Sequence, residues 1–276
     1  MNHADIPLLL SPEELEARRD NGPLLLVDLS EPGTYVQYHV PGAVFMDYAW
    51  IVRTERPRMG LLPVPERLEH VFSAYGLTPD THVVAYDDEG GGKAARLLYT
   101  LEVAGHRRWS LLDGGLRAWA NAGHPIDTQI HWPTPGRYVP QMNFEPVATR
   151  QYILDHLSDR DVVLLDVRSR GEYIGEKLYA KRGGHIPGAI HMEWTEAMDR
   201  ERNLRLKPEP HLRAMLAERG VSPEKTVVVY CQTHHRSAHT WFVLKYLGFD
   251  RVKGYPGSWS DWGNEPSTPI ESDAPE

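Results

Sequence analysis

The chain holds one cysteine, Cys231, in a stretch whose other side chains could make it reactive. A thiolate is the nucleophilic form of cysteine, and nearby positive charge stabilises it. Arg236 is always charged, and His234 and His235 become charged when they are protonated. We therefore interpret Cys231 as a candidate nucleophile. The alternative is a small buried core residue, which is the more common role of a lone cysteine.

The position of this loop favours the first interpretation. Thr226–Tyr230 is apolar and β-branched, which predicts a buried strand, and a helix is expected over residues 236–247. A loop between a strand and a helix N-terminus can turn several backbone N–H groups inward, as anion-binding nests do. The helix dipole adds positive potential at the same place. This predicts a cup of amides that would stabilise a thiolate and would equally hold a persulfide anion or an oxyanion.

The same pattern occurs twice along the chain. LLLVD at 24–28 matches VVLLD at 162–166, and HVPGA at 39–43 matches HIPGA at 185–189. Such matches in the same order indicate two copies of one α/β domain. Strands that alternate with helices predict a mainly parallel sheet with helices on both faces.

The repeat predicts an N-terminal domain over residues 1–130, a linker over 131–146 and a C-terminal domain over 147–276. The linker is rich in proline and has no clear period, which is typical of a semi-rigid connection. Sites in parallel sheets lie beyond the carboxyl ends of strands, and Cys231 follows such a strand in the C-terminal domain.

The two copies differ most in the loop after the central strand. Because Tyr86 matches Tyr230, Asp87 stands where the second copy has Cys231. The first loop continues as Asp-Glu-Gly-Gly-Gly, which is acidic and contains no thiol. We therefore predict a catalytically inactive N-terminal domain and a catalytic C-terminal domain.

Residues that recur in both halves are better explained by folding than by catalysis, since the first half has no thiol. The two recurring aspartates end their strands and are expected to accept local backbone hydrogen bonds. The recurring pairs are Asp28 and Asp166, His39 and His185, Tyr35 and Tyr173, and Trp119 and Trp262.

The composition is that of a soluble globular protein with no nucleic-acid or membrane partner. The net charge is −8, and no run approaches the ~20 apolar residues of a membrane span. One cysteine cannot build an intramolecular disulfide or a multi-cysteine zinc site. Residues 1–10 lack a basic start and are too short for a secretory signal, so a cytoplasmic location is expected.

At the Cys231 loop the chain resembles the rhodanese family, the thiosulfate sulfurtransferases, in their tandem-domain form. The loop CQTHHRS resembles that of a bacterial subgroup of this family. The resemblance covers roughly residues 10 to 270. It is carried by residues 231–237, 184–189 and 254–259, and by Asp28, 39–43 and 113–119 in the first half.

The resemblance implies two rhodanese-like domains and an enzyme that transfers sulfane sulfur by a ping-pong mechanism. Cys231 would take the outer sulfur of a donor and become a persulfide, and a thiophilic acceptor would then remove that sulfur. The partners would be a small-molecule donor and an acceptor, either cyanide or a small-molecule or protein thiol. The resemblance implies no metal and no cofactor beyond the covalent persulfide.

The expected donor is thiosulfate, and 3-mercaptopyruvate is the alternative. The loops of the vertebrate-type thiosulfate enzymes and of the mercaptopyruvate enzymes resemble Cys-Arg-Lys-Gly-Val-Thr and Cys-Gly-Ser-Gly-Val-Thr, and this chain has neither. Both groups also place an arginine where this chain has Glu172. The loop here therefore offers hydrogen-bond donors and titratable charge in place of a fixed charge next to the cysteine.

The whole loop is expected to bind the anion. Its members after Cys231 are Gln232, Thr233, His234, His235, Arg236 and Ser237. Arg236 is expected to close the loop by bonding to its carbonyl groups, and contact with donor oxygens is the alternative. One of the two histidines is expected to face the site and the other to face solvent.

Four residues outside the loop are candidates for a supporting or substrate-binding role. The Ser258 hydroxyl could reach the loop or cap a local turn. Trp194 could wall the cleft or pack in the core. Lys181 and Arg182 lie in an eight-residue insertion found only in the second half. They could add positive potential to the cleft or be solvated.

Two other functions are weaker alternatives. Phosphatases related to this fold resemble Cys-x5-Arg, whereas four residues separate Cys231 from Arg236. The shorter loop favours a single sulfur over a tetrahedral oxyanion. The other alternative is a non-catalytic module that senses sulfur or anions.

Overall fold

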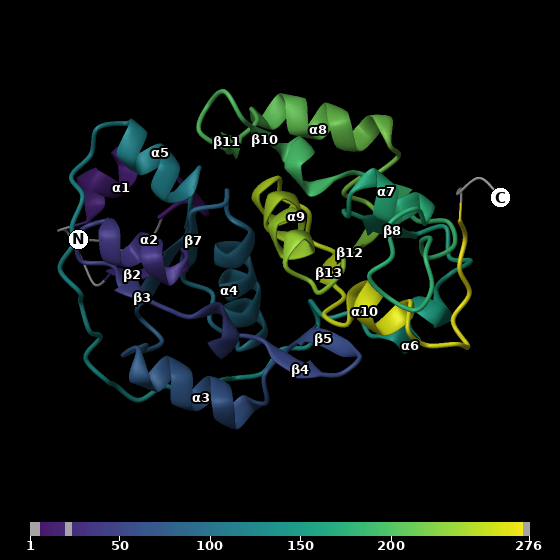
Figure 1. The fold of residues 1–276 in the computed structure, drawn as a ribbon, viewed down its shortest axis with the longest axis horizontal. Helices are drawn as coiled ribbons and strands as arrows, with labels where there is room; N and C mark the ends of the chain where they lie inside the picture. The colour runs from purple at the N-terminus through teal and green to yellow at the C-terminus, as the bar shows by residue number, and fades with distance from the viewer. Residues whose placement is uncertain (1–5, 20–23, 273–276) are drawn as a thin grey trace. The chain divides into compact units, whose positions relative to one another are not determined.

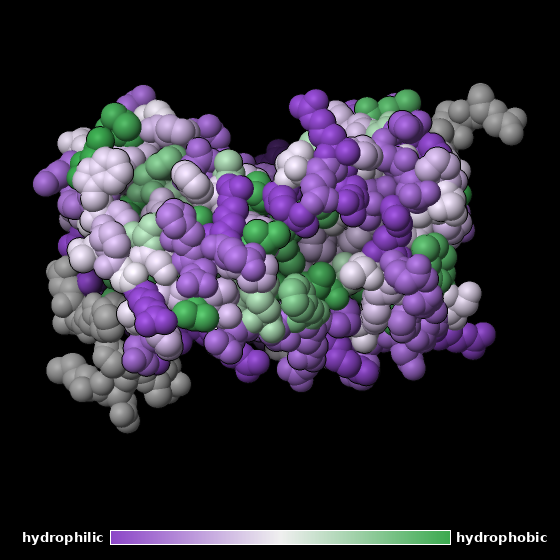
Figure 2. All heavy atoms as spheres, turned by 90° about the horizontal axis from the view of Figure 1, so that it is seen from below, coloured by the Kyte–Doolittle hydropathy of each residue, from purple (hydrophilic) through white to green (hydrophobic). Residues whose placement is uncertain are grey.

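The computed structural model describes residues 6–19 and 24–272, which form two compact units (Figure 1). Unit 1 comprises Met1–Ile51, Pro63–Asn143 and Met198–Leu206, and unit 2 comprises Val52–Leu62, Phe144–Ala197 and Lys207–Glu276. Hydrophilic side chains cover most of the face drawn in Figure 2, with hydrophobic ones in small groups between them. Within the described residues, none of the helices combines the length and apolar character needed to cross a membrane.

Unit 1 contains a parallel sheet in the order β1-β7-β6-β2-β3. Its strands are β1 (Leu9–Leu10), β2 (Leu24–Asp28), β3 (Val44–Phe45), β6 (His82–Tyr86) and β7 (Trp109–Leu112). Its helices are α1 (Pro12–Arg18), α2 (Pro32–Gln37), η1 (Tyr48–Trp50), α3 (Pro65–Ala74), α4 (Gly92–Val103) and α5 (Gly115–Asn121).

Unit 2 contains a parallel sheet in the order β13-β12-β8-β9. Its strands are β8 (Val162–Asp166), β9 (Ile190–His191), β12 (Thr226–Tyr230) and β13 (Val252–Gly254). Its helices are α6 (Arg150–Asp155), α7 (Arg170–Ile174), η2 (Trp194–Ala197), α8 (Glu209–Glu218), α9 (Arg236–Tyr246) and α10 (Ser258–Trp262). Parallel sheets flanked by helices confirm the predicted α/β fold class.

The recurring residues make the same contacts in both units. The hydroxyl groups of Tyr35 and Tyr173 donate to the carbonyls of Ala43 and Ala189, at 2.9 and 2.7 Å. Each of these tyrosines stacks on a histidine, His39 in unit 1 and His185 in unit 2. Trp119 and Trp262 donate to the carbonyls of Pro125 and Pro269. Asp28 and Asp166 accept backbone N–H bonds from Ser30 and Arg168. These paired contacts hold the fold together, as the structural interpretation of these residues predicts.

The compact units do not coincide with contiguous halves of the chain, because each half contributes a β-hairpin to the other unit. The hairpin of β4 (Arg53–Glu55) and β5 (Arg58–Leu61) belongs to unit 2, where β5 packs beside α10 (Figure 1). The hairpin of β10 (Met198–Asp199) and β11 (Arg205–Leu206) belongs to unit 1, where the Leu206 N–H donates to the Asp113 carboxylate at 2.7 Å. The two hairpins occupy corresponding places in the repeat.

Candidate active site

The loop with Cys231 lies between β12 and α9. Strand β12 is the second strand of its sheet and is buried along nearly its whole length, so Cys231 begins the loop at the carboxyl end of a fixed strand. Helix α9 begins at Arg236. The Cys231 side chain has no exposed surface. The sequence pattern of a buried strand, a short loop and a helix is therefore confirmed.

The first two carbonyl groups of the loop bond to helix α10 and not to groups around the sulfur. The N–H groups of Trp259 and Ser260 in α10 donate to the carbonyls of Cys231 and Gln232, at 2.9 and 3.0 Å. The N–H groups of Thr233 and Ser237 hydrogen-bond to the Cys231 thiol instead. The inward amides form the cup that the sequence predicted.

The environment of the Cys231 thiol lowers its pKa. Burial alone raises the pKa, because it removes water from the thiolate. The charge of Arg236, the Ser237 hydroxyl and the amides of Ser237 and Thr233 act in the opposite direction, and the pKa falls below its ordinary value. The Ser237 hydroxyl lies 3.4 Å from the sulfur. Cys231 is therefore buried among hydrogen-bond donors and positive charge, and not in purely apolar packing.

Ser258 makes both contacts that the sequence left open. Its Oγ accepts a hydrogen bond from the Cys231 N–H at 3.2 Å, and its hydroxyl donates to the Tyr255 carbonyl at 2.7 Å. Ser258 also has a φ of 48°, in the left-handed region that non-glycine residues rarely adopt. It thus fixes the start of the loop from the first residue of α10.

Arg236 has a partner that neither sequence interpretation included. Its two terminal nitrogens donate to the two carboxylate oxygens of Glu172, at 2.7 and 2.8 Å. The expected bonding of Arg236 to loop carbonyls was therefore wrong, because a bidentate carboxylate satisfies its planar donors better. Glu172 also caps α7 through Ser169. Glu172 was noted only as a departure from the family pattern, and its pairing partner lies 64 positions away.

The two loop histidines have different environments. His234 is fully buried, and its Nδ1 lies 2.8 Å from the Ser237 hydroxyl. His235 is half-buried, and its ring centroid lies 6.1 Å from that of Trp194. Trp194 is half-buried as well and also contacts His239 edge-on at 5.4 Å. Trp194 therefore lies beside the loop and the first turns of α9.

The remaining candidates support the site from outside. Gln232 donates through its amide to the Tyr179 carbonyl at 2.9 Å. Arg182 donates to the carbonyls of Trp262, Glu265 and Thr268. It therefore holds the segment after α10 in place, and its guanidinium is directed at these carbonyls and not at the Cys231 sulfur. Lys181 is exposed.

The β4–β5 hairpin supplies a contact that the sequence analysis missed. Gly60 packs so closely on the Thr233 carbonyl that an added Cβ would lie 1.9 Å from its oxygen. In the same hairpin, the Met59 N–H donates to the Ser260 hydroxyl at 2.9 Å. Gly60 has a φ of 74°. The signal in the sequence was the glycine itself, because glycine is the residue that adopts a positive φ and a close contact without strain. The first half of the chain thus contributes a wall to the Cys231 loop.

The corresponding loop of unit 1 keeps the cup and fills it with a carboxylate. Asp87 is fully buried and accepts hydrogen bonds from the N–H groups of Glu89, Gly91 and Ala94, at 3.0, 2.8 and 3.0 Å. Its main-chain carbonyl accepts from Leu116, just as that of Cys231 accepts from α10. The loop therefore turns backbone amides toward an acidic side chain in both copies, the carboxyl group of Asp87 in unit 1 and the thiol of Cys231 in unit 2.

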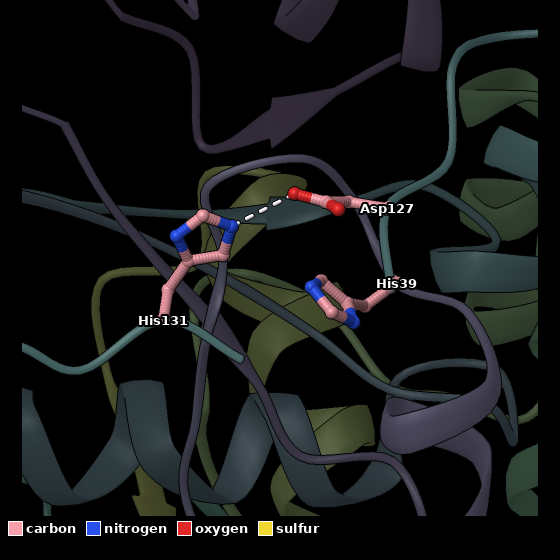
Figure 3. Close-up of side chains that lie close together, drawn as sticks. All are labelled: His39, Asp127 and His131. Carbon is pink, nitrogen blue, oxygen red and sulfur yellow. Dashed lines mark hydrogen bonds and ion pairs between the residues drawn. The ribbon is translucent and has the colours of Figure 1, made fainter. Parts of the chain in front are cut away.

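Unit 1 also contains a cluster of side chains with metal-ligand chemistry, His39, Asp127 and His131 (Figure 3). His131 Nε2 lies 2.8 Å from the Asp127 carboxylate. His39 Nδ1 lies 2.7 Å from the Tyr35 carbonyl, and its Nε2 lies 3.1 Å from the Gln129 carbonyl. Backbone carbonyls already contact both ring nitrogens of His39. We therefore interpret the cluster as a structural one, which holds the segment around Gln129 in place, and not as a metal site.

A cavity with a volume of about 580 Å³ lies in unit 1. Aromatic and apolar side chains line most of it, among them Tyr35, Phe45, Trp50 and Tyr75. All its lining residues belong to unit 1, whereas Cys231 belongs to unit 2. The cavity is therefore not part of the Cys231 site.

Comparison with known families identifies the class of protein that this fold and site define. The model of the rhodanese-like domain matches residues 11–122 and 149–265. The chain belongs to the rhodanese family, with two such domains.

Relatives of known name support an enzyme of the sulfurtransferase class. A thiosulfate sulfurtransferase of Azotobacter vinelandii is 44% identical over 97% of this chain and 98% of the relative. One of Pseudomonas aeruginosa is 42% identical over the same shares. A sulfur carrier protein of Thermus thermophilus is 33% identical over 98% of both chains. The chain is accordingly a sulfurtransferase.

Solved structures show the same architecture. The anaerobic ergothioneine biosynthesis enzyme of Chlorobium limicola, bound to trimethyl histidine, has a TM-score of 0.86 at 25% identity. That match covers 97% of this chain and 71% of that chain. A structure of EanB in a cysteine-persulfide form with ergothioneine has a TM-score of 0.87, with the same identity and coverage.

Proposed function

We propose that Cys231 carries the sulfane sulfur as a persulfide, and that the preferred donor is thiosulfate. The observation that carries this proposal is the amide cup around the Cys231 sulfur, together with the lowered pKa of its thiol. A buried thiol in apolar surroundings would stay protonated and inert. Here Arg236 and Ser237 favour the thiolate, which is the form that attacks sulfur.

In the first half-reaction, the Cys231 thiolate attacks the outer sulfur of thiosulfate. A new S–S bond forms to Cys231, the S–S bond within thiosulfate breaks, and sulfite leaves with the electron pair. The product is a persulfide anion on Cys231. The inward N–H groups of Thr233 and Ser237 stabilise this anion in the same way as they stabilise the thiolate.

In the second half-reaction, a nucleophilic acceptor attacks the terminal sulfur of the persulfide. The bond between the two sulfurs breaks, and Cys231 regains its thiolate with the electron pair. Cyanide becomes thiocyanate, and a thiolate acceptor becomes a persulfide. The mechanism needs no cofactor besides the persulfide. It does need a reduced Cys231, and this need fits a cytoplasmic location.

Two observations support thiosulfate over 3-mercaptopyruvate. The relatives in Azotobacter vinelandii and Pseudomonas aeruginosa bear the name thiosulfate sulfurtransferase. In this chain, both terminal nitrogens of Arg236 donate to the carboxylate of Glu172. The guanidinium is therefore not placed to bind the carboxylate of 3-mercaptopyruvate in the same bidentate way. Donor contacts then fall to backbone amides and to neutral side chains such as Gln232 and Thr233.

A donor panel tests this proposal. Initial rates are measured with thiosulfate or 3-mercaptopyruvate as donor and cyanide as acceptor, by thiocyanate formation. We expect a higher kcat/KM with thiosulfate and no thiocyanate from Cys231→Ser with either donor. A higher kcat/KM with 3-mercaptopyruvate would reverse the donor assignment. Hydrolysis of a phosphate ester without thiocyanate formation would favour the phosphatase alternative.

A further inference from the structure

Three buried side chains form a line that ends at the Cys231 sulfur. The Ser237 hydroxyl donates to the sulfur across 3.4 Å, and His234 Nδ1 lies 2.8 Å from the same hydroxyl oxygen. All three side chains have no exposed surface. Water therefore does not compete for these hydrogen bonds.

The Ser237 hydroxyl can donate a hydrogen bond to only one of its two neighbours, the Cys231 sulfur or the His234 ring. A serine hydroxyl has one hydrogen to donate and lone pairs that accept. If His234 carries a proton on Nδ1, it donates to Ser237, and the serine hydrogen is left for the sulfur. If Nδ1 is unprotonated, the serine hydrogen can turn to the imidazole instead, and the sulfur loses a donor. The state of His234 Nδ1 thus decides where the Ser237 hydroxyl points.

The backbone conformation at His234 limits which substitutions can test its side chain. His234 has a φ of 54°, in the left-handed region where asparagine, aspartate and histidine are enriched among non-glycine residues. Asparagine can therefore replace His234 without a change of backbone.

We propose that His234 is a positioning residue, which holds the Ser237 hydroxyl toward the sulfur of Cys231 in both the thiolate and the persulfide states. This inference rests on the proposed role of Cys231. His234 acts through Ser237 and touches neither donor nor acceptor in this account. It adds direction to a hydrogen bond, whereas Arg236 adds charge.

The test must separate this effect from those of the charged and titratable groups around the loop. Those groups are Arg236 and His239 on α9, His235 before it, Glu172 on α7, and the ion pair between Asp166, the last residue of β8, and Arg168. All of them stay in place when only position 234 is changed. Substitutions that differ only in the donor at the Nδ1 position are therefore the informative ones.

Three substitutions at residue 234 vary this donor. His234→Asn places an amide N–H where Nδ1 was and tolerates a positive φ. His234→Gln keeps an amide of similar size but moves its N–H beyond that point, and His234→Leu removes the donor. Ser237→Ala removes the next hydrogen-bond donor. His156→Leu, at the C-cap of α6, is a control for the loss of an imidazole elsewhere in unit 2.

The readout is the pKa of the Cys231 thiol, taken from the pH dependence of its alkylation rate by iodoacetamide. We expect wild type, His234→Asn and His156→Leu to share one pKa. We expect His234→Gln, His234→Leu and Ser237→Ala to have a pKa higher by about 1, which means about tenfold less thiolate at a pH below the pKa. The double variant His234→Gln, Ser237→Ala should resemble Ser237→Ala alone, because both changes interrupt the same series of hydrogen bonds to the Cys231 sulfur.

Two results would overturn the inference. One is an unchanged thiol pKa in His234→Gln when Ser237→Ala raises it. The other is a double variant whose shift is the sum of the two single shifts. Thermal unfolding of each variant identifies any that does not fold. The comparison of His234→Asn with His234→Gln is the safest in this respect, because both variants keep a polar amide at position 234.

Alkylation involves no sulfur transfer, so the two proposals can fail separately. A raised pKa in a chain that forms no persulfide would keep the role of His234 and reject the proposed function. A persulfide on Cys231 with no pKa change in His234→Gln would do the reverse.

Discussion

Arg236 and Glu172 form a bidentate ion pair whose two N–O distances are 2.7 and 2.8 Å. The carboxylate is 5% exposed and the guanidinium 22%, so water screens the pair weakly. The pair ties the first residue of α9 to α7, and it sets the direction of the positive charge that favours the Cys231 thiolate. The charge that activates the sulfur therefore depends on a carboxylate from another helix.

The first prediction concerns acid stability. Burial alone would raise the pKa of Glu172, but the bonds from Arg236 and Ser169 lower it from 4.5 to about 2. A lowered carboxylate pKa gives stability that is complete above pH 4.5 and is lost as the pH falls through about 2. The effect corresponds to roughly 3 kcal/mol of unfolding free energy.

Urea unfolding at a series of pH values checks this prediction. Between pH 5 and pH 2, the wild type should lose more unfolding free energy than Glu172→Gln, whose side chain does not titrate. The other carboxyl groups are shared by both proteins and cancel in the difference. If the two proteins lose stability in parallel over this range, Glu172 does not make the tight ion pair described here.

The second prediction concerns the charge of Arg236. The double variant Arg236→Gln, Glu172→Gln replaces the ion pair by neutral groups and leaves no buried carboxylate unpaired. The thiol pKa of Cys231 should rise by about 1, and kcat/KM near pH 7 should fall about tenfold, because less thiolate is present. Alkylation rates and thiocyanate formation measure the two effects. An unchanged pKa would show that the amides alone activate the thiol.

The third prediction concerns the hairpin wall. Gly60→Ala would place a Cβ 1.9 Å from the Thr233 oxygen, so the loop or the hairpin must move. We expect kcat/KM with thiosulfate to fall at least about tenfold, since small misplacements of reacting groups cost that much. Gly220→Ala is the matched control, because Gly220 has a similar φ of 71° and an added Cβ there meets nothing within 4 Å. Equal losses in both variants, or no loss in Gly60→Ala, would refute the role of the hairpin.

The sequence predicted the local parts of this site and missed the distant ones. The cup around Cys231 follows from a strand, a short loop and a helix that are adjacent in the chain, and so the pattern of residues 226–247 was enough. The pair of Arg236 with Glu172 depends on how α7 packs on α9, which no spacing in the sequence encodes.

The exchanged hairpin was missed for a similar reason. Residues 52–62 lie between the matched motifs of the first half, so the repeat analysis gave them no role. Their place in unit 2 is decided by tertiary packing of Gly60 and Met59 on the Cys231 loop and on α10. A comparison of the two halves of the chain finds the motifs that they share. It does not show which segment of one half packs in the unit formed mainly by the other half.

The fourth prediction concerns the loop of unit 1. The double variant Asp87→Cys, Cys231→Ser should transfer no measurable sulfur, although three amides already point at residue 87. Burial and the neighbouring Glu89 raise the pKa of Asp87 to about 6, and the same surroundings would raise the pKa of a thiol. Thiocyanate formation is the measurement. Activity in this variant would show that the amides suffice without a nearby arginine.

The most direct test of the account is the mass of the intact protein and of its Cys231 peptide after incubation with thiosulfate and removal of the excess. We expect the mass of one added sulfur atom on Cys231, its loss when cyanide is added, and no added sulfur on Cys231→Ser. A wild-type protein that gains no sulfur from any donor, or gains it elsewhere than on Cys231, would contradict the central claim.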